Sequence, residues 1–139
     1  MRNRIEQQRH RAAVFVAANH ERVATVTSAA ANMANVFLGR LASKVLLRNT
    51  LTNLQSLAQP ATLEAFALHL RQHASEFGRA GVSSSYWELI DGIFSLADAT
   101  GARWPYMTEE VRAVCLKHAA EHLEDCERIL EADVSKLSA

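Results

Sequence analysis

Two pairs of histidines have a spacing that suits metal or haem chemistry. His69 and His73 stand four residues apart, as do His118 and His122. On a helix, side chains at i and i+4 lie one above the other, so each pair can chelate one metal ion from successive turns. Histidines at half-buried positions more often make ordinary hydrogen bonds, and that interpretation is favoured for His118 and His122.

Cysteines accompany the second histidine pair. Cys115 and Cys126 lie on the same expected helix as His118 and His122, eleven residues apart. Four ligands from one straight helix cannot surround an ion tetrahedrally, so a metal site would need a ligand from elsewhere in the chain. Along a helix the cysteines are on the order of 16 Å apart, too far for a disulfide bond within the chain. They are expected to be free thiols of an intracellular protein.

His73 stands among large apolar side chains. Phe66, Leu70, His73 and Phe77 are spaced i, i+4, i+7 and i+11, on one face of a predicted helix. An imidazole on such a face is either a costly buried polar group or the ligand of something that fills an apolar pocket.

Catalysis by a nucleophile has little support. The serines at 83–85 are expected in a loop or a helix cap, and no GxSxG motif or phosphate-binding loop is present. Asp91 is the one carboxylate that falls between apolar neighbours. Whether the chain is an enzyme stays open, with a non-enzymatic role favoured.

The composition predicts that helices position these residues. Nearly half of the 139 residues are hydrophobic, only two are prolines, and no segment alternates with period two. We therefore expect one all-α domain over residues 1–139, with five to seven helices.

Local signals divide the expected helices. Residues 3–27 form one helix or two with a bend, and Ser28 restarts a helix to Leu57 in which Gly39 marks a kink or a corner. A third helix follows Pro60 and carries the stripe Leu63, Phe66, Ala67, Leu70, Ala74 and Phe77.

Two more helices are expected in the C-terminal half. Ser85 and Glu88 form a capping box, so a helix starts near Tyr86, and Gly101 ends it. Thr108 caps a last helix that extends to Leu137. The stripe of this last helix is Val111, Val114, Cys115, His118, His122, Cys126, Ile129 and Leu130. Tyr86, Trp87 and Trp104 are expected to close the core.

Charge and hydropathy limit the classes of partner that we expect this chain to bind. Fifteen basic and fifteen acidic residues cancel, which argues against nucleic acid as a partner. No apolar run is long enough to span a membrane, so no membrane partner is expected. The apolar run at 12–18 after a basic start leaves a targeting segment open, with a cytoplasmic location as the expectation.

Residues 63–123 resemble the second half of a bacterial single-domain globin. LEAFALHLRQHASEFG resembles the F helix, GVSSSYWELIDGIF the entry to the G helix, and WPYMTEEVRAVCLKHAAEHL the start of the H helix. Upstream, NVFLGR and LASKVLLRNTLTNLQSL resemble the CD corner and the E helix. The resemblance covers about sixty residues well and another twenty weakly.

The resemblance implies a haem pocket between the E-like and F-like helices. His73 would bind the iron, Phe37 would pack on the haem, and the distal side would come from Leu41 to Val45, with Lys44 as its polar candidate. Phe66, Leu70 and Phe77 would line the pocket, and Trp87 would lie on its proximal side.

Two functions remain open from these observations. The first is a globin that binds or senses a diatomic gas, oxygen or nitric oxide, at haem iron. The second is a haem-free globin-like or helical-bundle module that senses or interacts through its long C-terminal helix. For the second, Leu123, Cys126, Leu130 and Leu137 approximate a heptad seam that would form a homodimer.

Overall fold

The protein has an all-α fold. The computed structural model describes residues 4–40, 65, 67–68, 70–72, 83–104 and 106–138, and no strand occurs among them. The labelled helices are α1 (Arg4–Ala18), α2 (His20–Arg40), α6 (Ser83–Thr100) and α7 (Glu109–Ser138). None of these described helices is both long and apolar enough to span a membrane.

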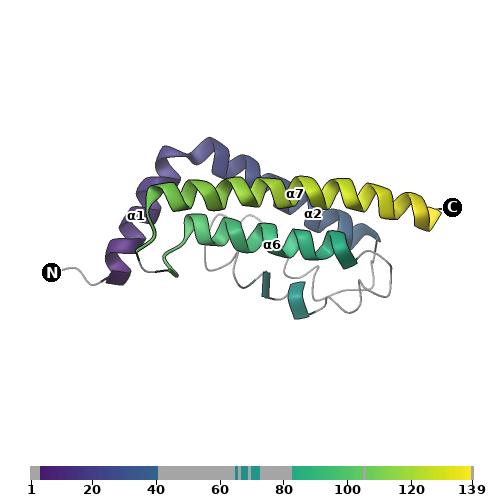
Figure 1. The fold of residues 1–139 in the computed structure, drawn as a ribbon, viewed down its shortest axis with the longest axis horizontal. Helices are drawn as coiled ribbons and strands as arrows, with labels where there is room; N and C mark the ends of the chain where they lie inside the picture. Colours follow the sequence, from purple (N-terminus) through teal and green to yellow (C-terminus); the bar gives the residue numbers. More distant parts are fainter. Residues whose placement is uncertain are drawn as a thin grey trace.

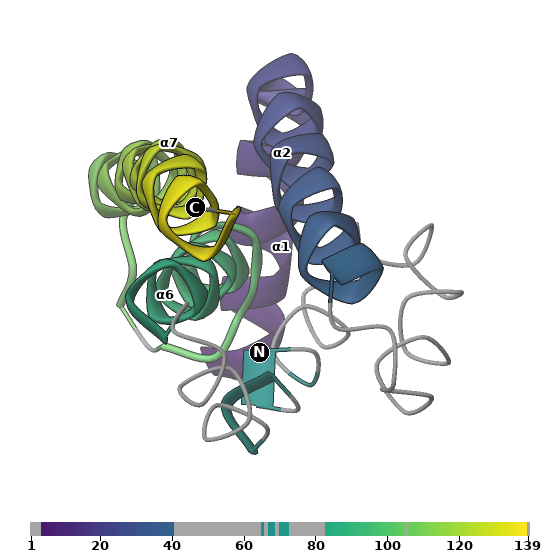
Figure 2. The same ribbon diagram turned by 90° about the vertical axis from the view of Figure 1, so that its right-hand side faces the viewer.

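The hairpin of α6 and α7 is the central unit of the described structure. The two helices run antiparallel, and α2 lies along them (Figure 1). Seen end-on, α6 and α7 stand on one side and α2 on the other (Figure 2). The helix α1 crosses the end of the hairpin where α6 stops and α7 begins.

A bend at Asn19 separates α1 from α2. The Asn19 backbone N–H and its side-chain Nδ2 both donate to Phe15 O, at 3.0 and 2.9 Å, and Val23 N–H donates to Asn19 O at 2.9 Å. The expected bend within residues 3–27 is thus confirmed. The expected restart at Ser28 is wrong, because α2 continues through it, and the corner expected at Gly39 does not interrupt α2, which is helical to Arg40.

The ends of α6 and α7 follow local signals in three of four cases. The last residue of α6 is Thr100, next to Gly101, and α7 extends beyond Leu137, as expected. Thr108 caps α7, because Val111 N–H donates to Thr108 Oγ1 at 3.2 Å. The expected start near Tyr86 is wrong: α6 begins at Ser83, and Ser85 is a fully buried helical residue.

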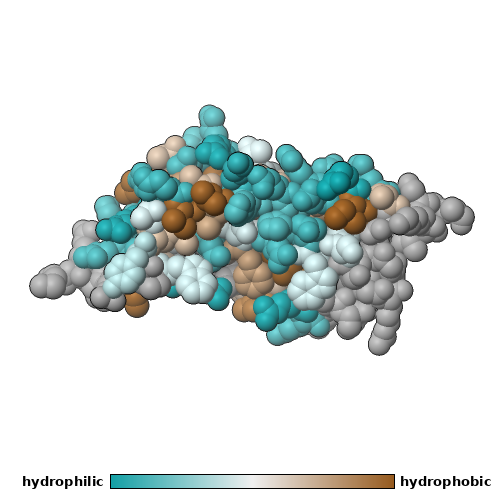
Figure 3. All heavy atoms as spheres, in the orientation of Figure 1, coloured by the Kyte–Doolittle hydropathy of each residue, from teal (hydrophilic) through white to brown (hydrophobic). Residues whose placement is uncertain are grey.

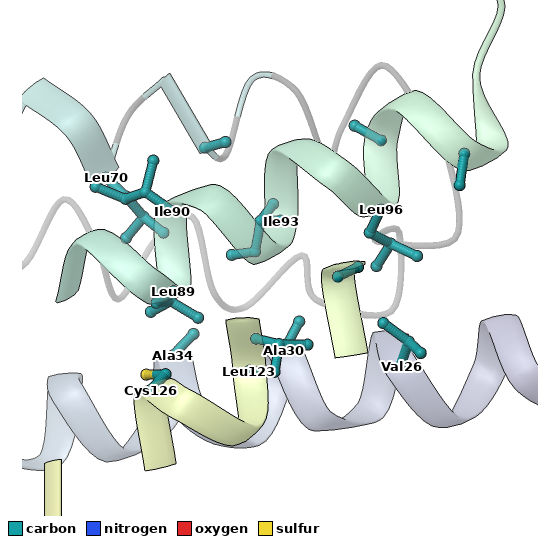
Figure 4. Packing of buried hydrophobic residues seen from close by; sticks show 14 of the residues in the cluster. Val26, Ala30, Ala34, Leu70, Leu89, Ile90, Ile93, Leu96, Leu123 and Cys126 are labelled. Carbon is teal, nitrogen blue, oxygen red and sulfur yellow. The ribbon is translucent and has the colours of Figure 1, made fainter. Parts of the chain in front are cut away.

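The core is built on α6. Figure 4 shows Leu89 and Leu96 of α6 pointing toward Ala34 and Val26 of α2. On the α7 side the helices approach closely at Gly92, where a Cβ would lie 3.1 Å from Leu123 Cγ. Small residues on α2 and α6 therefore let larger neighbours fill the space between the helices.

The buried stripe of α7 differs from the expected one. Val111 and Val114, which were expected to face the core, are 46% and 50% exposed. Among the described side chains of α7, the buried apolar ones are Leu116, Ala119, Leu123, Cys126 and Leu130, of which Cys126 and Leu130 were expected. The sequence pattern was ambiguous because apolar residues occur on both sides of α7, and packing against α6 and α2 decides which side is buried.

A segment whose described residues 65, 67–68 and 70–72 are helical packs against the start of α6. Its Ala67 and Leu70 are buried, whereas Leu68 is exposed. The Tyr86 hydroxyl, fully buried on α6, donates a hydrogen bond to Leu70 O. Tyr86 thus closes the core as expected, and it holds this segment onto α6.

Candidate functional site

Most residues of the expected haem pocket lie outside the described residues. This holds for Leu41, Lys44, Val45, Phe66, His73 and Phe77, and for the side chain of Phe37. Two residues of the expected pocket are described, and they differ in exposure. Leu70 is buried against α6, whereas Trp87 is 43% exposed. Neither residue lines one of the three cavities described below, and the haem pocket stays a prediction.

His122 belongs to a polar cluster between α6 and α7. Its Nδ1 lies 2.7 Å from Glu88 Oε2, and both side chains are partly exposed. Asp91, one turn further along α6, is exposed too. Although Asp91 is exposed, the partial desolvation of its carboxyl group raises its pKa above the usual value, with His122 lowering it and Glu88 raising it. Among the described residues, no group of three or more His, Cys, Asp or Glu side chains has the geometry to hold a metal ion.

The cysteines are free thiols with depressed reactivity. Cys126 is buried in the core, and this burial raises its pKa to about 12. Burial also raises the pKa of Cys115, with Asp98 adding to the effect. Because the thiolate is the nucleophilic and metal-binding form, neither thiol is activated for chemistry near neutral pH.

The side of the hairpin turned away from α2 exposes apolar and aromatic groups. We call this the outer face. It comprises Trp87 and Asp91 of α6, Trp104 of the connection, and Val111, Val114 and His118 of α7. Figure 3 shows apolar atoms there in patches among hydrophilic ones. The expected placement of Trp87 and Trp104 in the core is wrong, since both are more than two-fifths exposed.

Trp104 is held in place at the surface. Its Nε1–H donates to Asp98 Oδ1 at 2.7 Å, and the Arg103 guanidinium lies 4.8 Å from the centre of its ring. Tyr106, two residues on, has a φ of 63°, an uncommon backbone conformation for a bulky residue. A fixed, exposed indole loses little side-chain entropy on binding, which is typical of interface residues.

A buried arginine ties α7 to α6 and α1. Arg112 is 1% exposed, and its Nη1 donates to Ala99 O and Gly101 O at 2.9 and 2.7 Å. Its Nη2 donates to Gln8 Oε1 at 3.0 Å. Carbonyls at the C-terminal end of α6 carry partial negative charge and thus stabilise the guanidinium. Burial lowers the pKa of Arg112, and the nearby Arg11 lowers it further.

Three cavities open between the described helices. One, of about 260 Å³, lies between α2 and α7 beside Val26 and Leu123. Another, of about 430 Å³, lies between α1 and the end of α6 beside Val16 and Thr100. The third, of about 400 Å³, lies between α1 and the start of α7. Only this third cavity has a buried charged side chain, Arg112, in its wall.

Sequence reasoning singled out His122 and Asp91 but missed the contact of His122 with Glu88, and it missed Arg112 altogether. The bond between Arg112 and Gln8 joins residues 104 positions apart, so no local pattern signals it. No family model matches this sequence, and neither a curated protein nor a solved structure with significant similarity to it was found.

Proposed function

We propose that this chain is a helical interaction module of the sensory type, which pairs with a second copy of itself through the outer face. The observation that carries the proposal is that Val111 and Val114 are about half exposed on α7, while the exposed ring of Trp104 is anchored to Asp98. Apolar and aromatic groups gathered on an otherwise polar surface are typical of protein interfaces.

The pairing surface differs from the heptad seam expected from the sequence. Leu123, Cys126 and Leu130 are at most 4% exposed in the core of their own chain, so they are not available to a partner. The opposite side of α7 remains accessible. A dimer formed there leaves the core of each chain unchanged.

Complementary hydrogen-bonding groups favour a second copy as the occupant. On the outer side of the hairpin, α6 supplies the carboxylates Glu88, Asp91 and Asp98, while α7 supplies His118 and His122. A two-fold axis would place α6 of one copy opposite α7 of the other, so that the carboxylates of each copy can accept hydrogen bonds from the imidazoles of the other. Such self-complementarity is what a symmetric dimer requires.

The solution mass tests this proposal. Val114→Glu places a charge at the centre of the outer face, whereas Ile5→Glu makes the same change at a 58%-exposed apolar position on α1. By light scattering after size exclusion, we expect wild type and Ile5→Glu at twice the 15.4 kDa chain mass and Val114→Glu at the single mass. A monomeric wild type, or a dimeric Val114→Glu, would contradict the proposal.

Haem binding is the second candidate. It is supported by two described helical residues, Ala67 and Leu70, which are buried, and by the hydrogen bond that Leu70 O accepts from Tyr86. These residues precede His73 closely in the sequence. The test is titration with hemin. A Soret band that is lost in His73→Ala but retained in His20→Ala supports the candidate; protein that takes up no hemin eliminates it.

A further inference from the structure

The cavity between α1 and the start of α7 has an unusual concentration of donors. Its wall includes His10 and Arg11 of α1, Thr108 at the N-terminus of α7, and the buried Arg112. Each of these groups can donate a hydrogen bond, and two of them are permanently cationic. The one carboxylate in the wall belongs to Glu109, which is exposed.

Arg112, which lines this cavity, has one donor without a partner. Among the described residues, Nε of Arg112 is the one buried side-chain nitrogen or oxygen that has no hydrogen-bond partner. Its Nη1 and Nη2 bond to neutral acceptors only: two backbone carbonyls and the amide oxygen of Gln8. Leaving a buried N–H without an acceptor costs about 1–3 kcal/mol, a cost that an acceptor supplied from outside the chain would remove.

The charges around Arg112 indicate that this acceptor carries a negative charge. No described carboxylate lies within ion-pair distance of Arg112 or Arg11. The two guanidiniums are near enough for Arg11 to lower the pKa of Arg112. An anion between them would relieve this repulsion, and the N-terminus of the 30-residue helix α7 favours negative charge at the same place.

We propose that this cavity binds a small carboxylate with a short apolar chain. The Nε–Nη2 edge of a guanidinium matches the two oxygens of a planar carboxylate, which would take the free Nε–H and share Nη2 with Gln8. Val14 and Met107 supply an apolar wall for the chain of the ligand. The volume of about 400 Å³ suits a small ligand.

Two features select against other anions. The first turn of α7 is already capped by Thr108, and Glu109 lies in the cavity wall. A doubly charged phosphate would therefore find fewer free hydrogen-bond donors and more repulsion from Glu109 than a carboxylate would.

Because Nε is buried, we expect a lining side chain to turn when the ligand enters. The site is separate from the outer face and does not depend on pairing.

Calorimetric titration of the whole chain with butyrate tests the proposal, with butanol and inorganic phosphate as matched probes at constant ionic strength. We expect butyrate to bind and butanol and phosphate to give no saturable signal. Arg11→Met should weaken butyrate binding about tenfold. Arg112→Lys keeps the positive charge but loses the planar pair of guanidinium N–H donors, so it should weaken butyrate binding at least as much.

Glu109→Gln removes the repulsive carboxylate and should tighten butyrate binding, a gain that misfolding cannot imitate. Ile5→Glu, on α1 but outside the cavity wall, should bind like wild type. The proposal would be overturned if butyrate did not bind, or if it bound no better than butanol. It would also be overturned if the affinity for butyrate were unchanged in both Arg11→Met and Glu109→Gln, or if phosphate bound saturably and butyrate did not.

Discussion

The two sides of the α6–α7 hairpin both carry apolar groups but use them differently. On the inner side, Leu89, Ile93 and Leu123 are at most 3% exposed and pack against α2 and against one another. On the outer side, Val111 and Val114 are about half exposed. The comparison teaches that the inner side accounts for the fold, whereas the outer side is available for recognition.

The largest expected effect is a difference in the free energy of unfolding between substitutions on the inner side and on the outer side of the hairpin. Ile93→Ala removes a fully buried side chain, so we expect the free energy of unfolding to fall by about 2–5 kcal/mol in urea denaturation. Val114→Ala should change it by less than about 0.5 kcal/mol, because the side chain is exposed. Equal losses in the two variants would show that the outer face is also part of the folded core.

Arg112→Met should have the next largest effect. It leaves the carbonyls of Ala99 and Gly101 without their donors and removes the link to Gln8. We expect a loss of about 1–3 kcal/mol in the same urea experiment, with Arg11→Met close to wild type. If Arg112→Met is as stable as wild type, the arginine does not fasten α7 to α6 and α1.

The smallest expected effect is electrostatic. Burial, opposed by His122 and reinforced by Glu88, raises the folded pKa of Asp91 above 3.8, so the folded chain binds a proton more tightly than the unfolded chain. The contribution of Asp91 to stability is therefore greatest below pH 3.8 and falls as the pH rises through the folded pKa. Asp91→Asn should be slightly more stable than wild type at pH 7, by less than about 0.5 kcal/mol.

Thermal unfolding at several pH values checks this sign. The advantage of Asp91→Asn should disappear as the pH falls below the folded pKa of Asp91, whereas Glu131→Gln, at an exposed position on α7, should show no such trend. A destabilised Asp91→Asn at pH 7 would mean that the carboxylate is favoured in the folded chain.

Local signals predicted much of the fold. The Thr108 cap, the Gly101 stop and the bend before Ser28 depend on neighbouring residues, and the structure confirms them. The orientation of α7 was not predictable in this way. Valines and leucines lie on different sides of the helix, and long-range packing on α6 and α2 selects the side with Leu116 and Leu123.

The candidate sites were less accessible to sequence reasoning. An arginine within an amphipathic helix is ordinarily solvent-exposed, and only the approach of α1 and the end of α6 buries Arg112. Trp87 and Trp104 were expected in the core because large aromatic residues usually contribute to it. The haem residues, His73 foremost, lie outside the described residues, so that prediction stays untested.

Tryptophan fluorescence tests the central claim most directly, because both tryptophans of the chain, Trp87 and Trp104, lie on the outer face. Iodide quenching would be measured in wild type and in Val114→Glu over a range of protein concentrations. If the outer face pairs with a second copy, quenching of wild type falls as the concentration rises, while quenching of Val114→Glu stays constant. Quenching of wild type that does not change while its mass doubles would contradict the claim, since the chains would then associate through another surface.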